Sequence, residues 1–188
     1  MTRVLILPGS LREKSFSATL AGHTAERIVD AGGEAWLWDQ RKRPLPMADP
    51  DHHHDPGNHP DPSVRGLVTL AGQADAFILV TPVYHNSYSG LLKNCLDHLT
   101  IGQFSMKPVV LLGHGPRLTA IQAVDQLRTV VRGLYGLALP AQAVTTPDDY
   151  GTDAMGNPVL KDPTMRTRVD AAVTLLLEAA RPHSGATS

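Results

Sequence analysis

Two short runs of this sequence are apolar at almost every position, and this feature constrains the fold more than any other. They are RVLILP at residues 3–8 and DAFILVT at residues 75–81. A strand with one solvated face alternates apolar and polar residues, whereas a strand covered on both faces has no need to alternate. Strands of parallel sheets are covered in this way by the helices that connect them. The two runs therefore predict central strands of a parallel sheet.

Segments with helical spacing of apolar residues alternate with the strands. Three further strands are predicted at 34–40, 107–115 and 137–146. Helices are predicted at 15–33, 63–74, 89–100, 119–136 and 163–180. Such alternation produces right-handed parallel crossovers with helices on both faces of the sheet. We therefore predict an α/β fold with a five-stranded, doubly wound parallel sheet, built as a single domain of residues 1–182 with a flexible tail at 183–188.

The composition limits the kinds of partner that the chain can bind. It has 17 Lys and Arg residues and 18 Asp and Glu residues, so it lacks the basic surface of a nucleic-acid-binding protein. MTRVLILPGS lacks the segments of a signal peptide, and no apolar run is long enough to span a membrane. A single cysteine, Cys95, excludes a disulfide framework. We expect a cytoplasmic protein whose partner is a small molecule and not a nucleic acid or a membrane.

Three polar turns follow predicted strands: PGSLREKSFS, TPVYHNSYSG and GHGPRL. In open α/β sheets, ligands bind beyond the carboxyl ends of the strands, where the strand order reverses. In the first turn, the hydroxyls of Ser10, Ser15 and Ser17 and the guanidinium of Arg12 precede a helix, which suits a phosphate dianion. The alternative is that Ser15 or Ser17 only caps this helix.

The first two turns are similar to the motifs of a known family. GSLREKSFSATLA matches the pattern G-S-x-R-x-x-S-x-[NS]-x-x-L-A, and TPVYHNSYSGLLKNCLDHL resembles T-P-x-Y-x-x-S-x-x-G-x-L-K-N-x-L-D. GHGPRL occupies the place of a third, glycine-rich loop. With these motifs, the chain resembles the NADPH-dependent FMN reductase family, whose members are flavodoxin-like three-layer sandwiches and include flavin, quinone and azo reductases.

The resemblance implies an FMN site made by all three turns. The residues implied for the phosphate are Ser10, Leu11, Arg12, Ser15, Phe16 and Ser17. Those implied for the flavin ring are Pro82, Val83, Tyr84, His85 and Asn86, and those closing its pyrimidine side are Gly113, His114 and Gly115. No catalytic side chain is implied, because the flavin carries the chemistry. His85 and His114 are either ordinary loop residues or, if protonated, a source of positive charge beside the flavin.

The resemblance also implies the reaction. Hydride passes from NADPH or NADH to flavin N5, and the electrons then pass to an acceptor such as free FMN, a quinone or an azo compound. Homodimers or homotetramers are expected from the family, and a flavin-dependent monooxygenase is a further expected partner. An alternative is an FMN-containing dehydrogenase or reductase of one specific metabolite. A flavodoxin-like electron carrier is disfavoured, because a net charge of -1 is too neutral for docking on basic partners.

Two further features lie outside these motifs. Residues 51–62, DHHHDPGNHPDP, carry four histidines and read as a solvated loop, with a metal site or a partner contact as alternatives. Adjacent histidines do not easily converge on one ion, so no metal is expected there. Cys95 follows the second turn on a predicted helix with apolar neighbours, and we expect a packed core thiol rather than a redox nucleophile.

Overall fold

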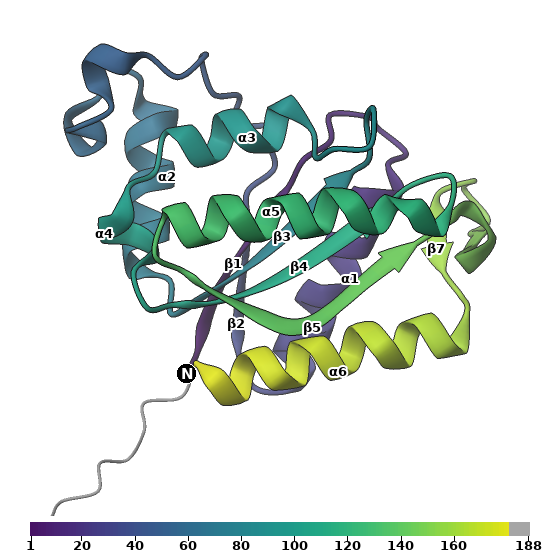
Figure 1. Ribbon diagram of the computed structural model, residues 1–188. Coiled ribbons are helices and arrows are strands. Elements are labelled where there is room, and N and C mark those ends of the chain that lie inside the picture. The colour runs from purple at the N-terminus through teal and green to yellow at the C-terminus, as the bar shows by residue number, and fades with distance from the viewer. Residues whose placement is uncertain (181–188) are drawn as a thin grey trace, which may run out of the picture.

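The computed structural model describes residues 1–180, which fold around a five-stranded parallel sheet (Figure 1). The strands are β1 (Arg3–Pro8), β2 (Glu34–Leu37), β3 (Ala76–Pro82), β4 (Pro108–His114) and β5 (Leu137–Thr145). Their order across the sheet is β2-β1-β3-β4-β5, and every neighbouring pair is parallel. The predicted doubly wound sheet is confirmed. The tail predicted at 183–188 lies outside the described residues.

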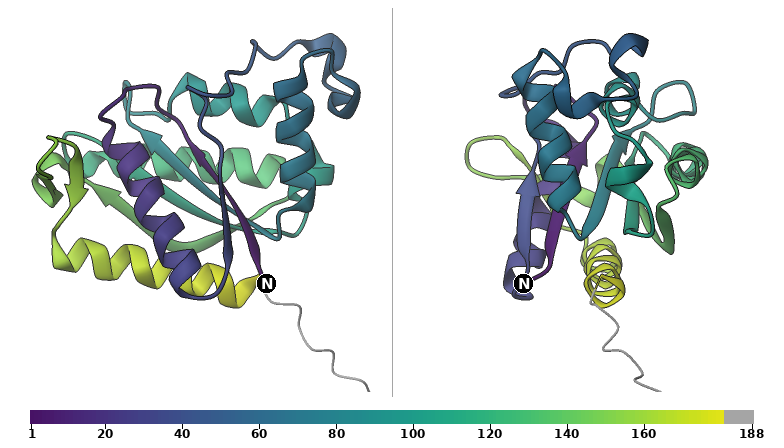
Figure 2. Two further views of the ribbon diagram at one scale, coloured as in Figure 1. Left: turned by 180° about the vertical axis from the view of Figure 1, so that it is seen from behind. Right: turned by 90° about the vertical axis from the view of Figure 1, so that its left-hand side faces the viewer.

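Helices cover both faces of the sheet, as the two views of Figure 2 show. They are α1 (Phe16–Asp30), α2 (Pro62–Gln73), α3 (Gly90–Asp97), α4 (Ile101–Phe104), α5 (Ile121–Gly133) and α6 (Pro163–Ala179). One core cluster joins the sheet to α2, α3, α4 and α5, and the other joins it to α1 and α6. Successive residues of β1 alternate between the clusters: Leu5 and Leu7 belong to the first, Val4 and Ile6 to the second. All four are at most 1% exposed, which explains why the run has no polar face.

Four predicted elements, at 15–33, 34–40, 89–100 and 119–136, extend three residues past their observed ends, and two of these ends have a clear local cause. The strand predicted at 34–40 ends at Leu37, because the Asp39 carboxylate accepts the N–H of Arg41 at 3.0 Å and turns the chain. The helix predicted at 89–100 ends at Asp97, and a capping box between Thr100 and Gln103 starts the separate short helix α4 at Ile101.

A small antiparallel hairpin was missed by the sequence analysis. Its strands are β6 (Tyr150–Thr152) and β7 (Pro158–Leu160), and Asp153 holds its tip by accepting the N–H groups of Met155 and Asn157. Strands of three residues are too short to show an alternating pattern. The hairpin matters because Tyr150 reaches the candidate site.

The sheet topology determines where a ligand can bind. From β1 the chain first crosses to β2 on one side and then to β3 on the other, so the order reverses between β1 and β3. Ligands of such sheets bind at the carboxyl ends beside this reversal. No helix among residues 1–180 is long and apolar enough to cross a membrane.

Candidate functional site

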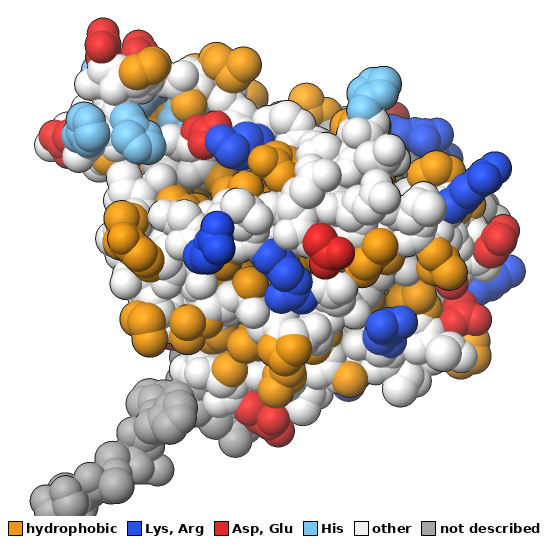
Figure 3. All heavy atoms as spheres, in the orientation of Figure 1, with side chains coloured by type: hydrophobic (Ala, Val, Ile, Leu, Met, Phe, Trp, Pro, Cys, Tyr) orange, Lys and Arg blue, Asp and Glu red, His pale blue; other side chains and the backbone are white. Residues whose placement is uncertain are grey.

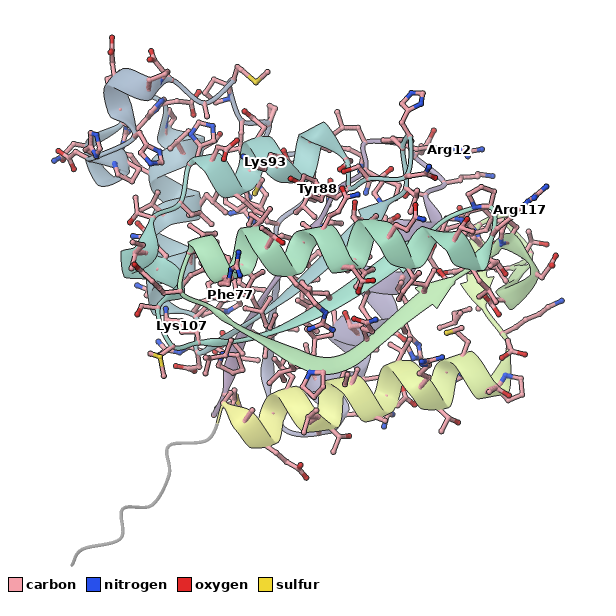
Figure 4. The ribbon with its side chains drawn as sticks, viewed as in Figure 1. Arg12, Phe77, Tyr88, Lys93, Lys107 and Arg117 are labelled. Carbon is pink, nitrogen blue, oxygen red and sulfur yellow. The ribbon has the colours of Figure 1, made fainter. Side chains whose placement is uncertain are left out.

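A cavity of about 260 Å³ opens at the carboxyl ends of β1, β3 and β4. It is lined by Ser10, Arg12, Ser15, Phe16, Ser17, Pro82, Val83, Tyr84, His114, Gly115, Pro116 and Pro147. All three turns singled out in the sequence therefore meet at one site. Figure 4 shows Arg12 and Arg117 at this end of the molecule and Lys107 at the other.

The first turn leads into the N-terminus of α1, and its two candidate serines play different parts. Ser15 is the N-cap of α1, and its Oγ accepts the N–H of Ala18 at 3.3 Å. Ser17 lies two positions further, as the second residue of the helix, and is 1% exposed, and its Oγ has no hydrogen-bond partner among residues 1–180. Capping therefore accounts for Ser15 but not for Ser17. A buried hydroxyl without a partner is costly, so it points to a missing acceptor.

The chemistry around Ser17 fits a phosphate. The N-terminus of a helix of 15 residues presents unpaired N–H groups and a partial positive charge. The guanidinium of Arg12 is exposed at the mouth of the cavity. Ser10 lines the same cavity, and its Oγ accepts the N–H of Arg12 at 3.3 Å, which bends the turn. Hydroxyl, guanidinium and helix terminus are donors that bind phosphate oxygens.

Two other cations hold the first turn from outside. The Arg41 guanidinium donates to the carbonyl of Glu13 at 3.2 Å, and Lys14 Nζ donates to the carbonyl of Met155 in the hairpin at 3.2 Å. Arg41 also pairs with Asp39 at 2.8 Å and lowers the pKa of that carboxyl. Arg41 and Lys14 therefore fix the backbone of the turn, whereas Arg12 remains available for a ligand.

The second turn has an unusual backbone. Tyr84 and Ser87 exchange both of their backbone hydrogen bonds, at 2.9 and 3.0 Å, and His85 and Asn86 between them have φ of 50° and 62°. Two consecutive positive φ values are typical of a type I′ turn. Below the turn, Thr81 Oγ1 accepts the N–H of Ser89 at 3.0 Å. The polar residues after β3 thus build a tight projecting turn beside the cavity.

The third turn needs glycine at one position. A Cβ on Gly115 would lie 2.6 Å from Cβ of Ala120 and 3.3 Å from Val83, so only glycine lets the second and third turns approach this closely. Gly113 lies inside β4, and a Cβ there would lie 2.9 Å from the side chain of Val124 in α5. Gly113 therefore faces the helix layer and does not line the cavity.

His114 is held between two aromatic rings. It stacks on Phe16 with 4.5 Å between ring centroids and meets Tyr150 edge-on at 5.6 Å. Its Nδ1 lies 3.0 Å from Oγ1 of Thr145. Burial lowers the pKa of His114 to about 4, against a smaller opposing effect of Asp149. His114 is neutral at neutral pH, so it supplies no positive charge to the cavity.

Tyr150 and Pro147 belong to this site although the sequence analysis did not name them. The Tyr150 hydroxyl lies 3.0 Å from Thr145 Oγ1 and donates to the carbonyl of Phe16 at 3.4 Å. Burial raises the pKa of this hydroxyl, so it stays protonated. The segment TTPDDY has only the Pro and Asp signal of a turn, and nothing local shows that it packs on the first turn.

Most of the predicted site residues line the cavity. The exceptions are Leu11, His85, Asn86 and Gly113. Leu11 is 53% exposed beside the first turn, and His85 and Asn86 are exposed at the tip of the second. They border the cavity mouth, beside residues that line it.

The histidine-rich loop lies at another end of the molecule, where Figure 3 shows several histidines gathered. Within residues 1–180, no three His, Cys, Asp or Glu side chains lie close enough to share a metal ion. The ring of His59 instead contacts His52 at 4.8 Å and His98 at 5.6 Å. Burial, and to a smaller extent these two neighbours, lower the pKa of His59, which favours the neutral form of its ring.

Cys95 is a core residue, as predicted. It is 0% exposed in α3, and burial raises the pKa of its thiol to about 12. The thiolate that redox chemistry requires is therefore absent at physiological pH.

Comparison with protein families decides what kind of protein has this site. The model of the NADPH-dependent FMN reductase family matches residues 2–151, which include all three turns. The chain belongs to this family. It is an NAD(P)H-dependent FMN oxidoreductase. The family predicted from the first two motifs is therefore confirmed, by a match that covers most of the chain.

Individual relatives agree with the family. The FMN-dependent NADPH-azoreductase of Staphylococcus aureus is 35% identical over 164 residues, which are 87% of this chain and 87% of the relative. Among solved structures, the apo form of an NADH:FMN oxidoreductase has a TM-score of 0.75 at 19% identity and covers 98% of this chain and 92% of its own. The NAD(P)H:(acceptor) oxidoreductase FerB of Paracoccus denitrificans has a TM-score of 0.72 at 21% identity, with 96% and 97% covered. At these identities the solved structures support the flavodoxin-like fold alone.

Proposed function

We propose that the cavity at the carboxyl ends of β1, β3 and β4 is the FMN site of this oxidoreductase. The residues assigned to the phosphate are Ser10, Leu11, Arg12, Ser15, Phe16 and Ser17. Those assigned to the ring are Pro82, Val83, Tyr84, His85 and Asn86, with His114 and Gly115 on its pyrimidine side; Gly113 is left out because it faces α5. The observation that carries the proposal is the buried Ser17 hydroxyl at a helix N-terminus near Arg12, which has no hydrogen-bond partner among residues 1–180.

The chain's own residues then bind and orient the cofactor. Ser17, Arg12 and the α1 N-terminus hold the phosphate dianion by charge-assisted hydrogen bonds. Neutral His114 and protonated Tyr150 keep the first and third turns together without adding charge. When bound, FMN supplies the redox chemistry by accepting hydride from a nicotinamide and passing two electrons on. No side chain of the cavity has to transfer a proton.

We further infer that the acceptor is a small planar molecule, such as an azo compound or a quinone, and that the hydride donor is NADPH. The support is the 35% identity to a protein named FMN-dependent NADPH-azoreductase and the openness of the cavity beside Tyr84, which is 56% exposed. Free FMN as the acceptor, with a monooxygenase downstream, is the competing outcome.

We also infer that residues 1–182 form one cytoplasmic flavodoxin-like domain that assembles as a homodimer or homotetramer. Three exposed apolar side chains support assembly: Tyr84 of the cavity lining is 56% exposed, and Leu11 and Leu118, which follow lining residues closely in sequence, are 53% and 70% exposed. A second subunit over them would exclude water from the ring end of the site.

A pair of titrations tests the site. Protein stripped of ligand is titrated with FMN and with riboflavin in one buffer, and the quenching of flavin fluorescence is followed. FMN should bind at least tenfold more tightly than riboflavin, a difference of about 1.4 kcal/mol. NADPH oxidation with an azo dye, a quinone or free FMN then identifies the acceptor. Equal and weak binding of the two flavins would remove the phosphate assignment.

A further inference from the structure

The turn of Tyr84, His85, Asn86 and Ser87 keeps a conformation that its sequence does not favour by itself. Positive φ is easy for glycine and costly for other residues, and here two consecutive non-glycine residues adopt it. His and Asn are among the residues that tolerate this region best, but an Asn-Gly pair is the usual choice for such a turn. Something outside the turn must therefore stabilise it.

Gln126 of α5 makes the contacts that do so. Its Oε1 accepts the hydroxyl of Ser87 at 2.6 Å, and its Nε2 donates to the carbonyl of Asn86 at 3.2 Å. A carbonyl can only accept, so the amide group can satisfy both partners in this orientation alone. One side chain thus makes hydrogen bonds to two successive residues of the turn.

The position of Gln126 on α5 restricts how far its backbone can move. Its neighbours Val124 and Leu127 are 0% exposed in the core beneath α5. The backbone that carries Gln126 therefore cannot follow a movement of the turn. The two hydrogen bonds that close the turn leave the N–H groups of His85 and Asn86 unused by it. These two N–H groups are donors that the turn can offer to a ligand.

We propose that Gln126 is a positioning residue for the ring end of the FMN site, an inference that rests on the proposed function. It holds the turn of residues 84–87 in its left-handed conformation, so that the N–H groups of His85 and Asn86 are already placed when a flavin arrives. Without Gln126 the turn relaxes toward negative φ. Binding must then order it again, which lowers affinity for the ring and not for the phosphate.

The experiment replaces Gln126 with Met, which keeps the length of the side chain and removes both hydrogen bonds. Gln122→Met is the matched control, because Gln122 is an exposed glutamine one turn earlier on the same helix. A third variant combines Gln126→Met with Asn86→Gly, since glycine adopts positive φ without cost and keeps the backbone N–H. Two quantities are measured: the dissociation constants of FMN and riboflavin, and amide hydrogen exchange of residues 84–87 in flavin-free protein.

Gln126→Met should weaken the binding of FMN and of riboflavin by the same factor, about tenfold. It should also speed amide hydrogen exchange of residues 84–87 in the flavin-free protein. Gln122→Met should change neither, and Asn86→Gly should restore most of the lost affinity. Unchanged affinities, a loss confined to FMN, or no rescue by glycine would each overturn the inference. If the wild-type protein binds neither flavin, the proposed function fails instead, and the exchange measurement still decides whether Gln126 holds the turn.

Discussion

Replacing Ser17 with Ala is expected to stabilise the flavin-free protein and to weaken its binding of FMN. The Ser17 hydroxyl is buried with no partner among residues 1–180. An unsatisfied buried polar group costs about 1–3 kcal/mol, and Ala is also the better helix former at this position in α1. We therefore expect the free energy of unfolding of the flavin-free protein to rise by about 1 kcal/mol.

The same substitution removes one donor to the phosphate. A hydrogen bond to a charged group contributes about 1.5–3 kcal/mol, so the dissociation constant of FMN should rise by about tenfold or more. Riboflavin has no phosphate, so its affinity should stay within about twofold. The two effects of Ser17→Ala thus have opposite signs, which no general loosening of the protein produces.

Urea denaturation of stripped protein and the two flavin titrations measure both effects. Ser63→Ala is the matched control, because Ser63 occupies the same position after the N-cap in α2, away from the cavity. It should change stability by only a few tenths of a kcal/mol and leave both affinities unaltered. A drop in stability for Ser17→Ala, or equal weakening of FMN and riboflavin, would show that the hydroxyl serves packing and not a phosphate.

Three other perturbations test separate parts of the structure. The pKa of His114 is about 4 in the folded chain, below its ordinary value, so the unfolded state takes up the proton first and stability falls as pH drops from about 6.5 toward 4. His114→Gln should reduce this loss by about 1 kcal/mol after allowance for partial exposure, as urea unfolding at pH 7 and 4.5 would show. Gly9→Ala places a Cβ 2.5 Å from Ser89 Oγ and should cost about 2 kcal/mol, seen as a Tm lower by about 4–8 °C. Cys95 should react with a thiol reagent at pH 8 only after unfolding, and fast labelling of native protein would contradict its burial.

The features that were predictable from the sequence depend on local patterns. The apolar run of β1 predicts burial on both faces, because after Arg3 it has no polar side chain to form a solvated face. Ser15 is recognisable as an N-cap from its place before an apolar helical pattern, and α1 begins directly after it. The three turns were recognisable because they follow strands, and the topology of parallel sheets brings the ends of neighbouring strands together.

The features that were missed depend on contacts between distant segments. Tyr150 joins the site through the carbonyl of Phe16, 134 residues away in sequence, from a hairpin whose strands have three residues each. Gln126 is an exposed glutamine on an amphipathic helix, and its pattern is that of any solvated residue. Its role follows only from the geometry of a turn 40 residues earlier. Such partners have no local signature, because neither segment needs the other to form its own secondary structure.

The three turns are fixed by different means, and this separates what each can contribute to binding. The first is set by the N-terminus of α1 and by Arg41 and Lys14, the second by Gln126, and the third by close packing of Gly115 on Ala120. A change in the first turn should alter the ratio of FMN to riboflavin affinity, because it acts on the phosphate alone. A change in the second turn should weaken the binding of FMN and of riboflavin equally, because both contain the same flavin ring. The ratio of FMN to riboflavin affinity therefore tells at which end of the site a perturbation acts. A substitution at Ser17 combined with one at Gln126 should weaken the binding of FMN by the product of the two single effects.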